Sequence, residues 1–196
     1  MRTQDAIDRL SLIHDQLARA EVYPGFRPPA VALVGVFGLL AAAVQPDASA
    51  VGFVTYWLAV AAGGAALGFA SAARSYAREE DELARRRTRR VMAQFLPALF
   101  AGTAVTLGVW RAGPEFTYLL PGLWALLFGL GVIAARPHLP AAVWAVGVGY
   151  VIAGAALLLT ADPTAEPSGW AVGGVFGIGH LATAVALQAG RRDDDE

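Results

Sequence analysis

Long apolar stretches separated by short polar ones dominate this chain. Six stretches lack Asp, Glu, Lys and Arg away from their ends, at about 29–45, 51–72, 91–110, 116–135, 139–160 and 168–189. A membrane-spanning helix needs roughly 20 mostly apolar residues, because each residue rises about 1.5 Å through a hydrocarbon core about 30 Å thick. The pattern therefore predicts an all-α polytopic membrane protein, with a bundle of six transmembrane helices at 29–190.

The connections between these stretches are typical of helix ends. Residues 45–49, 111–115, 136–140 and 161–168 combine Pro or Gly with polar side chains, which terminate helices. A soluble fold of alternating strands and helices would need shorter apolar segments with alternating polarity. The length and uniformity of the apolar segments therefore exclude that class.

Arginine positions predict how the bundle is oriented. If the N-terminus is cytoplasmic, 14 of the 15 basic residues fall in inner segments and only Arg111 in an outer loop. This asymmetry is a strong positive-inside signal and places both termini in the cytoplasm. All basic residues are Arg, and Ala, Gly and Val are abundant. That composition is typical of a GC-rich bacterial genome, so we expect the bacterial inner (cytoplasmic) membrane.

The overall composition removes several classes of function. The chain is 56% hydrophobic and only 16% charged, its net charge is −1, and it has no Cys. A soluble domain is usually about 25% charged. The balance suggests no nucleic-acid partner. The chain lacks HExxH, GxSxG and a phosphate-binding Gly loop, so we expect a non-enzymatic protein with no catalytic residues, no metal and no cofactor.

Residues 1–28 predict a cytoplasmic amphipathic helix and a linker. One apolar stripe recurs at spacings of three and four, formed by Ala6, Leu10, Ile13, Leu17 and Ala20. Such a helix either rests on the membrane surface and the inner ends of the bundle or docks a partner protein.

The densest charge lies between the second and third predicted spans. The basic cluster consists of Arg85, Arg86, Arg87, Arg89 and Arg90, and it follows the acidic residues 79–82. No Gly or Pro interrupts 72–92, which predicts two helices that extend into the cytoplasm and meet in a short turn. The cluster is interpreted as a self-paired turn that enforces topology, as a site for anionic lipid headgroups, or as a docking site for a protein. A charged cytoplasmic tail follows at 191–196.

His180 is the one ionisable residue predicted near the middle of a span. Tyr150 lies near the middle of the preceding span. Because the two spans run in opposite directions, both side chains share a depth, and a hydrogen bond would satisfy both. The pair is interpreted either as a structural polar pair or as a ligand-binding site. Gly177 and Gly179 leave room for a flat ring, which keeps a His-ligated haem or pigment as a third alternative.

Two pairs of glycines have the spacing that lets membrane helices approach closely. They are Gly64 with Gly68, and Gly173 with Gly177. This spacing predicts helix packing within the chain or in a homo-oligomer.

The order of these features resembles an uncharacterised family of small six-helix bacterial integral membrane proteins. The matching stretches are LIHDQLARAEVY, RRVMAQFLPALFAGTAVTLGVW, YLLPGLWALLFGLGVIAA and GWAVGGVFGIGHLATAVAL. The resemblance implies the six-helix architecture, an Arg-rich turn before the third span and a last span with a His, which corresponds to His180. It implies no particular activity.

These observations favour a sensor or accessory subunit that acts through a cytoplasmic or membrane protein partner. The cytoplasmic face carries nearly all the charge, and the outer loops are short. The alternative is a small-solute transporter or channel with a cavity near Tyr150 and His180. A His-ligated carrier is the third hypothesis.

Overall fold

The computed structural model describes residues 27–46, 49–78, 82–136, 139–165 and 168–195. Of these residues 89% are helical, so the all-α fold class is confirmed. The predicted amphipathic helix lies outside the described residues, and that prediction is not addressed by the structure.

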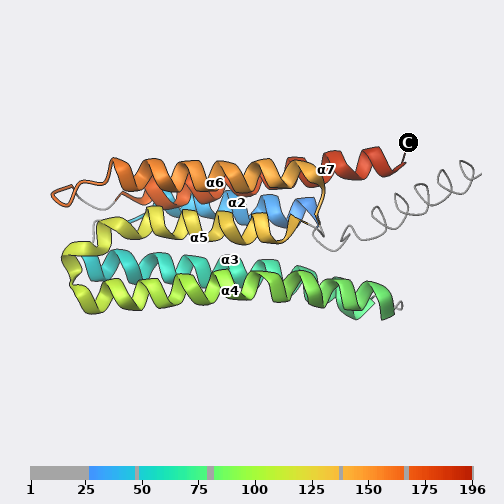
Figure 1. The fold of residues 1–196 in the computed structure, drawn as a ribbon, viewed down its shortest axis with the longest axis horizontal. Helices are drawn as coiled ribbons and strands as arrows, with labels where there is room; N and C mark the ends of the chain where they lie inside the picture. The colour runs from blue at the N-terminus through green and yellow to red at the C-terminus, as the bar shows by residue number, and fades with distance from the viewer. Residues whose placement is uncertain (1–26, 47–48, 79–81, 137–138, 166–167, 196) are drawn as a thin grey trace, which may run out of the picture.

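Six α-helices follow one another along the described chain (Figure 1). They are α2 (Pro28–Ala43), α3 (Ala50–Arg78), α4 (Glu82–Ala112), α5 (Leu120–Ala134), α6 (Ala141–Leu159) and α7 (Val175–Asp195). A 3-10 helix, η1 (Pro114–Leu119), leads directly into α5, and a π-helical turn, η3 (Trp170–Gly174), leads into α7. The helices lie side by side along the long axis and alternate in direction, so the start of α2 and the end of α7 share one end of the bundle.

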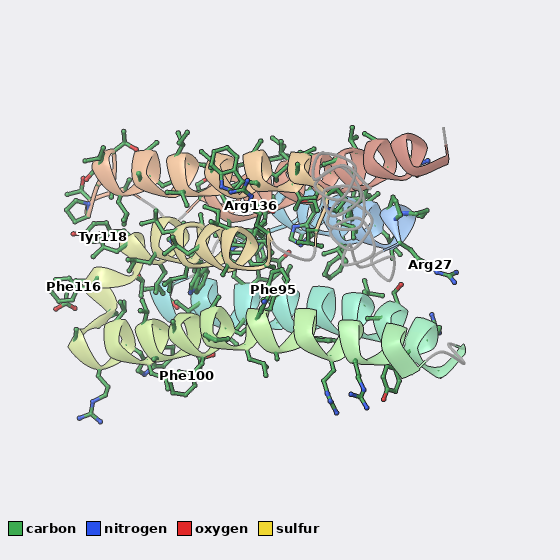
Figure 2. The ribbon with its side chains drawn as sticks, turned by 45° about the vertical axis from the view of Figure 1, so that its right-hand side comes forward. Arg27, Phe95, Phe100, Phe116, Tyr118 and Arg136 are labelled. Carbon is green, nitrogen blue, oxygen red and sulfur yellow. The ribbon has the colours of Figure 1, made fainter. Side chains whose placement is uncertain are left out.

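The surface of the bundle is apolar, as expected of an integral membrane protein. Five helical segments are long and apolar enough to cross a membrane, and Pro28–Ala43 is apolar but shorter. Leu159 is 88% exposed and Phe100 is 77% exposed, and Figure 2 shows Phe100 pointing away from the bundle. Such large apolar side chains are stable on an exterior that faces hydrocarbon and costly on one that faces water.

The charged helix ends extend further than the apolar pattern alone would place them. Helix α3 continues to Arg78 and α4 begins at Glu82, whereas the apolar spans within them are Ala50–Arg74 and Ala93–Ala112. Neither extension contains a Gly or Pro to end the helix. Helix α7 likewise continues to Asp195, so most of the predicted charged tail forms its last turns.

Glycines bring the backbones of α2 and α7 into direct contact. A Cβ on Gly35 would lie 2.8 Å from the Gly177 carbonyl oxygen, and a Cβ on Gly177 would lie 2.9 Å from the Gly35 carbonyl oxygen. Neither helix can therefore carry a side chain at these positions. Without a hydrophobic driving force between helices in lipid, this close approach is a main source of association. It holds the short helix α2 against the long helix α7.

Helices α5 and α6 form the second close pair. A Cβ on Gly154 would lie 2.7 Å from the Leu126 amide nitrogen and 2.8 Å from the Gly122 carbonyl oxygen. Nearer the other end, a Cβ on Gly129 would lie 2.8 Å from the Gly147 carbonyl oxygen. The two backbones thus touch over most of their shared length, and α6 packs on the outer side of α5.

A compact apolar core closes the end of the bundle opposite the charged helix termini. Phe53 and Trp57 are 1% and 3% exposed, and they pack with Ala42, Leu120 and Val172 from three other parts of the chain. Trp57 Nε1 donates to the Gln45 side-chain oxygen at 2.6 Å. This core ties α2, α3, α5 and η3 together.

Polar groups at the two ends of the bundle make local contacts. Arg136, labelled in Figure 2, lies with its guanidinium carbon 5.9 Å from the centre of the Trp144 ring, a cation–π distance. In the loop after α6, the Thr164 hydroxyl and amide both donate to Asp162, at 2.7 and 2.8 Å. These hydrogen bonds stabilise the carboxylate and lower the pKa of Asp162. The apolar helices therefore end in locally satisfied polar groups.

Candidate intramembrane site

The structure places Tyr150 of α6 and His180 of α7 in contact. Tyr150 Oη lies 3.0 Å from His180 Nδ1, and Tyr150 is 2% exposed. Both groups also meet the carbonyl oxygen of Phe176, one turn before His180: the Tyr150 hydroxyl donates to it at 3.1 Å, and Nδ1 lies 2.7 Å from it. The three groups form one hydrogen-bonded unit between the two helices.

This geometry favours the imidazole tautomer with its proton on Nδ1. A carbonyl oxygen can only accept, so Nδ1 carries a proton and donates to Phe176. A charged imidazolium at this depth would need a counter-ion, and none of the residues named in this unit is acidic. In the neutral ring the second nitrogen, Nε2, is then a hydrogen-bond acceptor.

Aromatic rings enclose the pair. Phe128 of α5 lies with its ring centre 5.0 Å from Tyr150, 5.3 Å from Phe176 and 5.4 Å from His180. The Tyr150 ring rests against the backbone of Gly179, where an added Cβ would overlap its atoms. The space beside Gly179 is thus filled by Tyr150, and the space beside Gly177 by Leu39. A flat cofactor ring therefore does not fit beside Gly177 or Gly179, where the sequence had allowed one.

His180 also borders a central cavity of about 470 Å³. Helices α2, α3, α4, α5 and α7 surround it, whereas α6 contributes only Val143 of its residues Ala141–Leu159. Figure 1 shows α3 and α4 on one side of the bundle, and α4 packs there against α5. Figure 2 shows Phe95 of α4 directed into this interior.

Several polar groups on the cavity wall already have partners. The Thr106 hydroxyl donates to the Gly102 carbonyl at 2.7 Å and accepts from Trp124 Nε1 at 2.9 Å. The Thr103 and Thr183 hydroxyls donate to carbonyls of their own helices, at 3.0 and 2.8 Å. Within the described part of the chain, His180 Nε2 forms no hydrogen bond, because both polar contacts of the ring are made by Nδ1.

The two predicted glycine pairs behave differently. Gly177 contacts the backbone of α2 as described above, and a Cβ on Gly173 would meet the Gly38 carbonyl oxygen and the Ala42 Cβ of the same helix. A Cβ on Gly68 would meet nothing within 4 Å, and one on Gly64 would meet only a methyl group of Val34, at 3.4 Å. Both line the cavity instead. Within the described residues, no backbone atom of another helix lies within 4 Å of a Cβ at either position, so packing of this pair against a second copy of the chain stays a prediction.

The basic cluster occupies the first part of α4, before its apolar span. Arg85, Arg86, Arg87, Arg89 and Arg90 all lie within the helical residues Glu82–Ala112. The side chains of Arg86 and Arg89 are exposed. The cluster lies at the same end of the bundle as the start of α2 and the end of α7 (Figure 1). It is separated along α4 from the cavity and from the Tyr150–His180 pair.

Sequence reasoning identified the polar pair and, in the transporter hypothesis, a cavity near it, but not the residues of the other helices that line this cavity. The wall residues Trp57, Thr106 and Trp124 come from three helices, and only the spatial arrangement of those helices brings them together. Among the described residues, no group of three or more His, Cys, Asp or Glu side chains is placed to hold a metal ion.

No protein-family model, curated protein or solved structure matches this chain. Its function is therefore inferred from the residues and geometry described above.

Proposed function

We propose that this chain is a non-enzymatic integral membrane protein of the bacterial inner membrane, which acts as a sensor or accessory subunit through a protein partner. In this proposal all six helices cross the bilayer. Helix α2 has 16 residues and extends about 24 Å. Its close packing on α7 favours a full crossing despite that length, because a short span is accommodated by local thinning of the bilayer.

The arginine distribution supports a cytoplasmic location for both termini. The described arginines at the charged end belong to α2's start, the α3–α4 tip, the end of α5 and the end of α7, whereas Arg111 lies near the opposite end of α4. Positive residues are retained on the cytoplasmic side during insertion. The end that carries the basic cluster is therefore assigned to the cytoplasm.

The observation that carries the proposal is the protrusion of the α3–α4 hairpin. Residues 82–92 are helical but precede the apolar span that begins at Ala93. They extend α4 by about 16 Å beyond that span. A helical segment rich in arginine suits recognition of an acidic protein surface, because guanidinium groups form bidentate contacts with carboxylates. Anionic lipid headgroups would use the same chemistry at the membrane surface.

Single-cysteine labelling tests the orientation. The natural chain has no Cys, so each introduced thiol is unique. In intact cells, a membrane-impermeant maleimide is expected to label Glu115→Cys and Thr164→Cys, whereas Thr88→Cys should react only after the membrane is permeabilised. Labelling of Thr88→Cys in intact cells would reverse the assignment and remove the basis for a cytoplasmic partner.

Affinity capture from gently solubilised native membranes tests the partner. Changing the five arginines of the basic cluster to Gln should reduce recovery of the partner at least tenfold, which corresponds to about 1.4 kcal/mol. The matched variant changes the same five residues to Lys, which keeps the positive charge that directs topology. Deleting residues 1–20 tests the other candidate docking element. If no protein is enriched with the natural chain, or if none of these changes alters recovery, the proposal fails.

The cavity supports a second candidate function, a carrier for an apolar molecule. His180 lies on its wall, as the transporter hypothesis required, but the wall is overwhelmingly apolar. Such a lining disfavours a polar solute, which would lose its hydration without replacement. A His-ligated carrier has less support, since Nδ1 is occupied and Tyr150 fills the space beside Gly179.

A further inference from the structure

The central cavity is long. Its lining extends along α3 from Trp57 to Ala72 and along α4 from Phe95 to Leu107, which is about 22 and 18 Å at the helical rise per residue. Its volume of about 470 Å³ is within the range of small-molecule sites. A lining that follows two helices over this length suits an extended hydrocarbon chain.

The cavity opens toward the membrane between α3 and α4. Apart from Arg27 at the start of α2, the lining residues with exposed side chains all belong to these two helices, for example Leu58, Phe69, Leu99 and Leu107. Those of α2, α5 and α7 are buried or half-buried. Leu99 and Leu107 lie inside the apolar span Ala93–Ala112. A molecule that enters through this opening is therefore dissolved in the hydrocarbon.

One polar atom on the wall calls for a specific kind of ligand. His180 Nε2 is an acceptor without a donor, and the ring reaches Tyr150, on the outer helix α6, through its other nitrogen. Nε2 is thus the ring nitrogen without a hydrogen-bond partner, on a residue that lines the cavity. An acceptor left unpaired in an apolar environment is costly, and a ligand with a donor at this point removes that cost.

We propose that the cavity binds a neutral single-chain lipophile with a hydroxyl group, such as a medium-chain alcohol, whose hydroxyl donates to His180 Nε2. The chain then runs toward the core at the far end, because Val172, Trp57 and Trp124 line the cavity in that direction. Val172 precedes His180 by eight residues, about 12 Å along the helix. The ligand is neutral because no charged residue among the described lining residues lies near His180 to pair with a charge. The one that is charged, Arg27, lies at the other end of the cavity. This site is separate from the basic cluster and does not depend on the proposed partner.

Tryptophan quenching by brominated probes tests the site. In the full chain, reconstituted in lipid nanodiscs, the exposed Trp110, Trp144 and Trp170 are changed to Phe, so that Trp57 and Trp124 report from the cavity wall. Three probes of equal chain length carry bromine at one end and a hydroxyl, a methyl ether or a methyl group at the other. Concentrations are expressed per lipid.

The hydroxyl probe is expected to quench at about tenfold lower concentration than the ether or the alkane, as one hydrogen bond to a buried acceptor implies. His180→Phe should abolish this preference and leave alkane quenching unchanged. Gly102→Leu should block all three probes, because Gly102 lines the cavity with open space beside it. Gly108→Leu is the matched control, since Gly108 also has open space but lies outside the lining.

Equal quenching by the three probes in the protein that retains His180 would overturn the proposal. The cavity would then be one that accepts plain acyl chains. A hydroxyl preference that persists in a folded His180→Phe protein would overturn the assignment to Nε2. Partner capture is measured separately, so failure here leaves the proposed function untouched.

Discussion

Replacing Gly173 by alanine is expected to destabilise the protein by about 2 kcal/mol, whereas the same change at the adjacent Gly174 should be neutral or slightly stabilising. A Cβ at Gly173 would lie 2.7 Å from both Ala42 Cβ and Trp57 Cη2, and closer still to the Gly38 carbonyl oxygen. At Gly174 the nearest atom outside its immediate neighbours is 3.7 Å away, on Trp170.

The size of the effect at Gly173 follows from what surrounds it. Two of the three obstacles, the Gly38 carbonyl and the Ala42 methyl group, are held rigidly by the backbone of α2. They cannot rotate away, so α2 itself must move. In lipid, α2 has no other strong reason to stay at this distance from α7, because hydrocarbon solvates its apolar side chains equally well. The cost is therefore a loss of packing along the whole contact.

Unfolding in mild detergent with added denaturant, followed by helical circular dichroism, measures both variants. Gly173 and Gly174 differ by one position, so helix propensity and lipid exposure during unfolding are closely matched. Equal stability of the two alanine variants would show that α2 does not pack on η3 and α7 as described.

The helices were predictable from sequence because hydrocarbon leaves the backbone few choices. Every peptide group must be hydrogen-bonded within the segment, so a long apolar run without charges becomes a helix. The predicted span at 139–160 matches α6, Ala141–Leu159, to within two residues at each end. The helical extensions into the charged stretch were also predictable, because no Gly or Pro interrupts 72–92 and an arginine-rich stretch forms helix as readily as the apolar stretch after it.

Contacts between helices were much less predictable. Gly64–Gly68 and Gly173–Gly177 have identical spacing, yet only the second pair touches another backbone. Spacing shows that a smooth face exists, but the neighbour of that face depends on how all the helices are arranged. The Tyr150–His180 contact was easier to predict. The two residues lie near the middle of consecutive antiparallel spans, so counting residues is enough to place both side chains at the same depth.

The cavity could not be predicted from any single segment. Its lining combines small residues of α3, including Gly64 and Gly68, with residues of α2, α4, α5 and α7. Helices α5 and α6, by contrast, close on each other through glycines in backbone contact. The same residue type thus produces tight packing in one place and open space in another.

Truncating Trp57 to alanine is expected to have the largest effect on stability, a loss of about 3–5 kcal/mol. Trp57 is 3% exposed and contacts residues from α2, α5 and η3 as well as its own helix. Its indole also stacks edge-on with Tyr56, at 5.4 Å between ring centres. The substitution removes the packing contacts of the buried indole and its hydrogen bond to Gln45.

Two further variants divide this loss into its causes. Trp57→Phe keeps an aromatic ring but removes the N–H donor, and should cost about 1–3 kcal/mol. Trp110→Ala is the matched control, because Trp110 is 48% exposed and should change stability by less than about 1 kcal/mol. Stability is read from helical circular dichroism during unfolding in detergent.

Trp57 also connects the fold to the cavity, since it belongs both to the apolar core and to the cavity wall. If the core holds α3 in place beside α2, then Trp57→Ala should free α3 and widen the opening toward α4, in addition to lowering stability. Hydrogen exchange of the α3 backbone amides is expected to rise in this variant and to stay unchanged in Trp110→Ala. Unchanged exchange in both would mean that α3 is positioned by its contacts with lipid and not by this core.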